Sequence, residues 1–78
     1  MTDKKLPRIT GKEALGALER VGWYRARQKS SHIVLKHRDK PGARVVLPLH
    51  SGEILLPKTM ASVLDQAGLT VEQFNELL

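Results

Sequence analysis

The chain has no cysteine among its 78 residues, which excludes disulfide frameworks and thiolate metal sites. This absence suits a reducing compartment, so we expect a cytoplasmic protein. No apolar run approaches the roughly 20 residues of a membrane span, and the basic N-terminus leads into no apolar signal segment. We therefore expect no membrane association. A chain this short predicts one domain with a thin core, made from one sheet face and the helices that cover it.

Acidic residues are scarce in the middle of the chain. From Arg20 to Arg44 there are eight basic residues and a single acid, Asp39, which gives this segment a net charge of +7. The rest of the chain carries a net charge of −2. A basic centre indicates a surface that faces a polyanion such as nucleic acid, or an acidic protein partner. A solvated surface that binds nothing is the simpler alternative.

Helix signals lie at the two ends of the sequence. Thr10 and Glu13 form a capping box, and apolar residues at helical spacing predict a helix over 11–21 that ends before Gly22. A second helix is predicted over 57–67, with a proline in its first turn and a glycine after its end. A second capping box, which begins at residue 70, predicts a short C-terminal helix from that residue onward.

Strand signals fill the centre. They predict strands over 23–29, 32–37 and 44–49, with a turn over 38–42. Pro48 places the third strand at a sheet edge or ends its pairing there, because proline donates no ladder hydrogen bond. A regular first strand places Trp23, Arg25 and Arg27 on one side, an assignment that a bulge would change.

Together these elements predict an α+β fold of order α-β-β-β-α. Two short hairpins give a three-stranded antiparallel sheet with helices on one face and an open face. A short extra helix follows at the C-terminus. We expect residues 1–8 to form a flexible N-terminal arm and residues 9–78 to form the domain.

His32 is the main candidate for chemistry. In a regular strand it shares one face with Val34 and Lys36, whereas Ile33 and Leu35 point to the core. An imidazole titrates near neutral pH, so it suits the proton transfers of RNA phosphodiester cleavage. An ordinary histidine at the end of a strand is the competing interpretation.

Neither metal chemistry nor serine hydrolysis is favoured by the remaining residues. His37 points away from His32 in a straight strand, and His50 lies at the far end of the third strand. No histidine pair has close ligand spacing, so we expect no metal and no cofactor. Ser31 and His32 are adjacent and face opposite ways, which disfavours a serine nucleophile.

The central cations are candidate phosphate contacts, because lysine and arginine bind phosphate without reading sequence. With the turn that precedes His32, the candidate RNA-binding set is Arg25, Arg27, Lys29, Ser30, Ser31, Lys36 and Arg44.

Several of these pieces, in this order and spacing, resemble the HicA toxins, small mRNA interferases of HicAB toxin–antitoxin pairs. The resemblance covers about residues 9–78. Its residues are Gly11-Lys12-Glu13, Leu18-Glu19, Gly22-Trp23, Arg27 to His32, Val46 to Pro48, His50, Gly52, Pro57 and Gln66 to Leu69.

The resemblance implies a double-stranded-RNA-binding-domain-like fold, and a metal-independent endoribonuclease with a catalytic histidine at the position of His32. It also implies mRNA as substrate and a HicB-like antitoxin as partner. The family pattern before the histidine is Gly-Ser-His, whereas this chain has a serine, Ser30, in place of the glycine. The family's glycine after the proline of the second helix is Lys58 here. The alternatives are a non-catalytic RNA-binding module, and an interaction protein whose basic face binds only an acidic partner.

Overall fold

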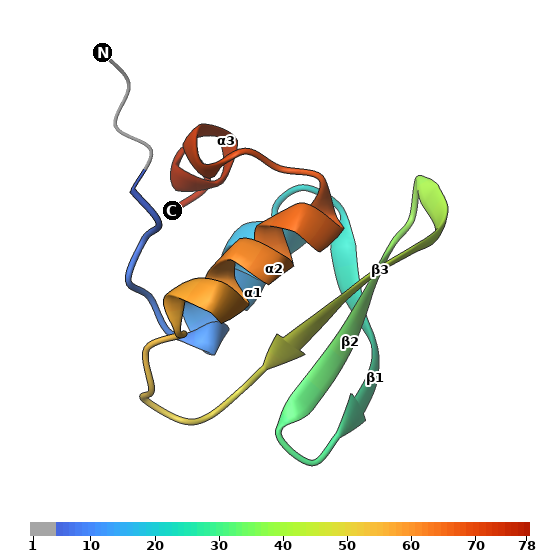
Figure 1. The fold of residues 1–78 in the computed structure, drawn as a ribbon. Helices are drawn as coiled ribbons and strands as arrows, with labels where there is room; N and C mark the ends of the chain where they lie inside the picture. The colour runs from blue at the N-terminus through green and yellow to red at the C-terminus, as the bar shows by residue number, and fades with distance from the viewer. Residues whose placement is uncertain (1–4) are drawn as a thin grey trace.

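The computed structural model describes residues 5–78 and has the predicted α+β architecture. Both larger helices lie against one side of a three-stranded antiparallel sheet of order β1-β2-β3, with β2 in the centre (Figure 1). The elements are α1 Gly11–Glu19, β1 Trp23–Lys29, β2 His32–His37, β3 Lys40–Pro48, α2 Pro57–Ala67 and α3 Val71–Asn75. Within residues 5–78, no helix has the length and apolar character to cross a membrane.

Local sequence signals set the helix ends. Both predicted capping boxes are present, with Thr10 accepting from the Glu13 backbone N–H and Thr70 accepting from that of Gln73. The α1 helix ends at Glu19, two residues before its predicted end. Beyond that residue, the backbone N–H groups of the next three residues bond three positions back, in a tighter turn.

The second hairpin departs from prediction. β1 and β2 have their predicted bounds, but β3 begins at Lys40 instead of residue 44 and ends at Pro48. The prediction of a turn over 38–42 is wrong, because the hairpin closes with two residues, and Pro41 and Gly42 already belong to β3. The register shifts there, and Gly42 has a φ of +87°, a conformation that glycine adopts easily.

A bulge at Ala26 divides β1 into two halves. Arg25 pairs with Leu35 and Arg27 with Val34, so Ala26 has no partner. Because paired residues share a face, Trp23 and Arg25 lie on the helix-covered face and Arg27 on the open face. The prediction that these three residues share one side is therefore wrong.

The core lies between the sheet and the helices. On the sheet its members are the inward-facing residues of β2 and β3, namely Ile33, Leu35, Val45 and Leu47, all fully buried. Trp23 joins them from β1 and Phe74 from α3. Burying side chains of this size contributes roughly 1.5–3 kcal/mol each, which is how a domain of this size is stabilised.

Two contacts fix the helices against β3. A Cβ on Gly11 would lie 2.3 Å from the Pro48 carbonyl oxygen, so the start of α1 meets the end of β3 at van der Waals distance. On the outer edge of β3, the Val46 N–H donates to Gln66 Oε1 of α2 across 2.8 Å. This bond covers an edge group that would otherwise be free to pair with another strand.

The N-terminal segment is only partly described. Residues 1–4 of the predicted arm lie outside the described residues. Leu6 is partly buried against the core, and the Leu55 N–H donates to the Ile9 carbonyl across 2.8 Å. The division into an arm over residues 1–8 and a domain over residues 9–78 stays a prediction.

Candidate active site

His32 is the first residue of β2 and is exposed on the open face of the sheet. The ladder pairs it with Lys29 of β1 and with Pro48 of β3. Its inward-facing neighbour Ile33 is fully buried, which fixes the orientation of the strand at this point. The imidazole is therefore displayed by a strand that the core holds in place.

His50 lies beside His32, although sequence analysis did not connect the two residues. Antiparallel pairing brings the end of β3 to the beginning of β2, and the Leu49 N–H donates to the Ser31 carbonyl just beyond the ladder. The two imidazole centroids are 6.4 Å apart, with ring planes at 82°. The register of the β2–β3 hairpin predicts this proximity. That register can be derived from the sequence only if the turn between the two strands is placed correctly.

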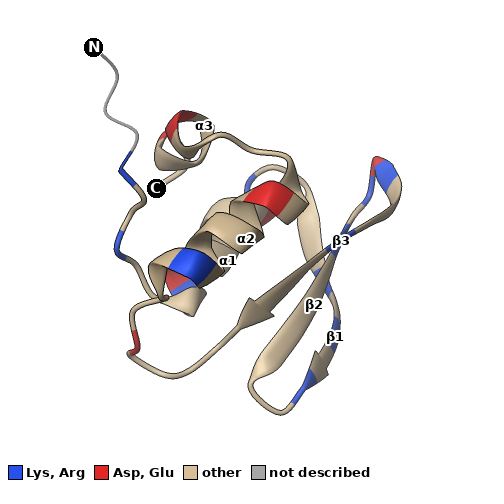
Figure 2. Ribbon diagram, viewed as in Figure 1, with Lys and Arg blue, Asp and Glu red and all other residues tan. Residues whose placement is uncertain are grey.

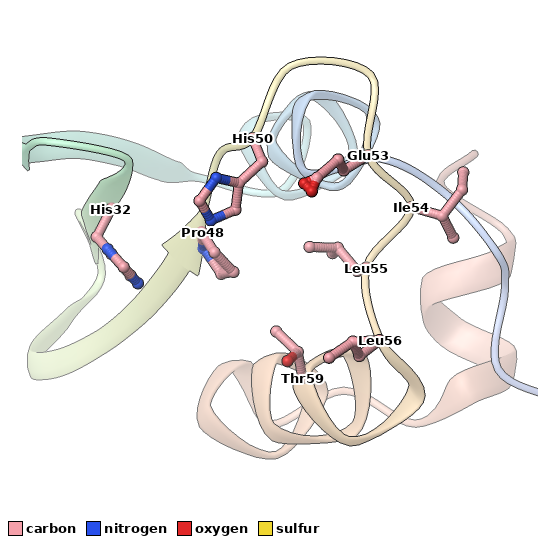
Figure 3. Close-up of a pocket in the computed structure, with 8 residues that line it drawn as sticks. All are labelled: His32, Pro48, His50, Glu53, Ile54, Leu55, Leu56 and Thr59. Carbon is pink, nitrogen blue, oxygen red and sulfur yellow. The ribbon is translucent and has the colours of Figure 1, made fainter.

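Both imidazoles line one cavity of about 440 Å³ at the corner between the sheet and α2 (Figure 3). Glu53 and Thr59 add polar groups, and the Glu53 carboxylate points to the side where His50 lies. The remaining wall is apolar, formed by Pro48 and the residues before α2, namely Ile54, Leu55 and Leu56. Leu56 is 70% exposed and Ile54 is 51% exposed, so this wall faces solvent.

The first turn of α2 borders the same cavity through Thr59. The N-cap residue, Leu56, makes no side-chain cap hydrogen bond. Backbone N–H groups of the first turn therefore add partial positive charge at this side of the cavity.

Cations follow the open face away from His32. Arg27, Lys36 and Arg44 line a shallow hollow of about 280 Å³ together with Ala26 and Val34. Lys36 is four residues along β2 from His32, about 13 Å at the usual rise of a strand. Lys29 lies next to His32 itself. The open face thus joins four of the predicted cations with the candidate histidine.

Arg25 is the exception among the predicted cations. It lies on the helix-covered face, where its Nε is 4.0 Å from a Glu19 carboxylate oxygen of α1. Figure 2 shows that the acidic segments lie on the helices, on the loop before α2 and at the tip of the second hairpin. All charged residues of the three strands are basic, and Arg25 alone among the candidates faces an acidic helix position.

Comparison with protein families matches residues 11–69 to the HicA toxin of bacterial toxin–antitoxin systems. This match runs from the first residue of α1 to the residue after the glycine that ends α2, and so contains the whole site. The chain belongs to the HicA toxin family. A search of curated proteins found no match. HicA toxins are mRNA interferases, and each has an antitoxin as its counterpart.

In this HicA chain the turn before His32 has a strained residue. Ser30 has a φ of +57°, the only positive φ among non-glycine residues of the described chain. This is the position of the glycine in the family pattern Gly-Ser-His. Ser31, the second turn residue, is partly buried, and its carbonyl accepts the bond from Leu49.

Replacing Ser30 with glycine is expected to stabilise the protein by about 0.5–1 kcal/mol, because glycine adopts a positive φ without a steric penalty. Thermal unfolding of the two proteins measures this difference. Ser31→Gly is the matched control; its φ is not positive, so it should destabilise. A lower melting temperature for Ser30→Gly would contradict the prediction.

His37 is a structural residue of this HicA fold. Its Nε2 donates to the Val21 carbonyl across 2.6 Å, and its Nδ1 accepts from the Asp39 N–H across 3.0 Å. The ring also packs edge-on against Trp23, with centroids 5.1 Å apart. A Cβ on Gly22 would lie 2.7 Å from Nε2, so this site admits only glycine at that position. Both nitrogens of His37 are therefore occupied.

Metal ligands do not gather in the described part of the HicA chain. Residues 5–78 contain no group of three or more His, Cys, Asp or Glu side chains placed to hold a metal ion. The cavity offers two imidazoles and one carboxylate that are spread around its rim.

Proposed function

We propose that this HicA toxin is a metal-independent endoribonuclease that cleaves mRNA in the cytoplasm. The observation that carries the proposal is the position of His32, an exposed imidazole at the end of a row of cations. In this mechanism the 2′-hydroxyl of the RNA attacks the adjacent phosphorus, and His32 moves a proton as general base or general acid. Each role is filled by the RNA itself or by a side chain of this chain.

The cations of the open face would hold the RNA backbone. Lys29 lies closest to His32 and would contact the scissile phosphate, where positive charge stabilises the developing negative charge. Arg27, Lys36 and Arg44 would contact neighbouring phosphates along the open face. Ser30 and Ser31 would contribute turn hydroxyls, as predicted. Arg25 stays a prediction as an RNA contact, and its place beside α1 gives it the weakest support.

The test of this function is cleavage of RNA by the purified toxin in the presence of a chelator. We expect cleavage to continue and the 5′ fragment to end in a 2′,3′-cyclic phosphate, since the nucleophile is the neighbouring 2′-hydroxyl. RNA with a 2′-deoxy residue at the mapped site should resist cleavage there. Activity that disappears with chelator and returns with magnesium or zinc would overturn the metal-independent mechanism.

RNA affinity is expected to fall steeply with salt, because each neutralised phosphate releases counterions. Lys29→Ala and Lys36→Ala should each reduce the slope of log affinity against log salt by roughly one. Fluorescence anisotropy with a 2′-deoxy-blocked RNA measures the slope. Lys12→Ala, on the exposed side of α1, is the control and should leave it unchanged. A flat salt dependence for the unmodified toxin would mean that the basic face is only solvated.

A non-catalytic RNA-binding module is the second candidate, because the basic open face alone suffices to bind a phosphate backbone. Salt-dependent binding without any cleavage of a mixed mRNA pool would favour it. The same assay therefore separates the two functions, since only the toxin as proposed produces new RNA ends.

We also propose a HicB-like antitoxin that covers His32. The basic open face favours a partner that presents acidic residues, which would speed association by electrostatic steering. The exposure of His32 favours direct occlusion of the site over distortion of the fold. A purified complex with the neighbouring gene product tests this. Cleavage of RNA by that complex at the rate of the free toxin would contradict occlusion.

A further inference from the structure

We propose that His50 is a second catalytic residue, which performs the proton transfer complementary to that of His32. This inference rests on the proposed ribonuclease function and deepens it, because one histidine moves only one of the two protons in the reaction. The position of His50 supports it in three respects: how the residue is held, what its ring nitrogens contact, and how far it lies from His32.

Backbone contacts hold His50 in place. Pro48 pairs with His32 in the β2–β3 ladder, and the Leu49 N–H bonds to the Ser31 carbonyl. The chain then turns sharply at His50, where the Glu53 N–H donates back to the His50 carbonyl across 3.0 Å. Gly52 makes this turn possible with a φ of +74°. The position of His50 relative to His32 is therefore set by the sheet and a tight turn.

The ring nitrogens of His32 and His50 are available for substrate. Within residues 5–78, neither imidazole makes a hydrogen bond to another protein group, and the two rings only meet edge-on. His37 shows the contrast, because both of its nitrogens bond to backbone groups. The structure thus separates one histidine that stabilises the fold from two that open into a cavity (Figure 3).

The separation of the two rings suits a phosphodiester between them. A proton-transfer group must come within about 2.6–3.2 Å of its oxygen. With centroids 6.4 Å apart, each ring reaches a different oxygen of one phosphate. The apolar wall formed by Ile54, Leu55 and Leu56 leaves room beside the phosphate for a flanking nucleotide.

The two proton transfers balance the reaction. A neutral imidazole takes the proton of the 2′-hydroxyl as the 2′-oxygen bonds to phosphorus. The bond from phosphorus to the 5′-oxygen breaks, and the protonated imidazole of the other histidine gives its proton to that oxygen. The products are a 2′,3′-cyclic phosphate and a free 5′-hydroxyl. Proton exchange with water then restores both rings.

The experiment compares His50→Ala and His50→Gln with the unmodified toxin on an RNA whose cleavage position has been mapped. We expect kcat to fall at least about 100-fold in both variants. Affinity for the same RNA with a 2′-deoxy block should change less than twofold, and the melting temperature should be kept. Ser51→Ala, an exposed neighbour in the same turn, is the matched control and should cleave normally.

A second substrate assigns the chemistry. In an RNA with sulfur replacing the 5′-oxygen at the cleavage position, the leaving thiolate needs no proton donor. The rate loss of one histidine variant, His32→Ala or His50→Ala, should largely disappear with this substrate, and that of the other should persist. The histidine whose loss disappears is the proton donor. A merely structural residue would lose rate equally on both substrates.

The outcomes separate this proposal from the proposed function. Absence of any RNA cleavage by the unmodified toxin contradicts the ribonuclease function itself. Full activity of His50→Ala beside an inactive His32→Ala overturns only the role of His50. Equal behaviour of both histidine variants on the oxygen and sulfur substrates also overturns it, because a donor and an acceptor must respond differently.

Discussion

Replacing His32 with alanine should lower the rate of RNA cleavage by a factor of about 10²–10⁴, the usual contribution of one proton-transfer group. The loss should appear in kcat, because Lys29, Lys36 and the other cations that we propose as contacts of the RNA backbone are unchanged. Toxicity on expression should disappear with it. Cleavage of a labelled RNA by equal amounts of variant and unmodified toxin measures the effect.

The fold should tolerate this change. The His32 imidazole is exposed and makes no hydrogen bond to another protein group within residues 5–78, so the free energy of unfolding should change by less than about 0.5 kcal/mol. Gln28→Ala provides a matched control, because Gln28 is an exposed strand residue whose ladder partner is Ile33, and its side chain therefore lies on the face opposite to that of His32. Equal cleavage by His32→Ala and the unmodified toxin would remove His32 from the mechanism.

Gly11→Ala should disrupt the contact between the start of α1 and the end of β3. Its new methyl group would lie 2.3 Å from the Pro48 carbonyl oxygen and 2.9 Å from a Leu49 methyl carbon. Backbone must shift to relieve the first contact, and we expect a loss of about 1–3 kcal/mol in the free energy of unfolding. In a domain of this size, each kcal/mol lowers the melting temperature by about 4–8 °C.

The same substitution tests the geometry of the site. Pro48 and Leu49 lead directly to His50, so a displaced end of β3 should move the His50 imidazole relative to that of His32. A shift of about 1 Å can cost 100-fold in rate. Gly16→Ala is the matched control in the same helix, since nothing lies within 4 Å of its new Cβ. It should stabilise the protein by about 0.5–1 kcal/mol. If both variants melt at the same temperature, the close contact at Gly11 does not exist.

Local signals predicted most of the fold. Capping boxes at Thr10 and Thr70 and the glycine after α2 act within a few residues, so the sequence alone placed those helix ends well. The early start of β3 was missed, because Pro41 and Gly42 favour a turn locally. They have no partner in β2 and lie in the strand only because the pairs on either side, Lys40 with His37 and Arg44 with Lys36, hold the chain there. Tertiary pairing overrode the local preference.

The site was predicted only in part, for a similar reason. His32 stands out in the sequence because it opens a strand between cations. His50 carries no such local mark, and its proximity to His32 depends on the register across the hairpin. Arg25 was grouped with Arg27 because a strand without a bulge alternates regularly, and nothing in the sequence around Ala26 marks the bulge.

The bulge at Ala26 therefore reverses the alternation of side chains along β1. Before Ala26, the alternation of side chains turns Trp23 toward the core. After Ala26 the alternation is reversed, so that Arg27 and Lys29 point to the open face beside His32. If the strand alternated regularly through Ala26 without a bulge, Trp23, Arg27 and Lys29 would share one face, and the strand could bury the tryptophan or present the two cations on the open face, but not both. One unpaired residue thus lets a seven-residue strand contribute to the core with one half and to the open face of the sheet with the other.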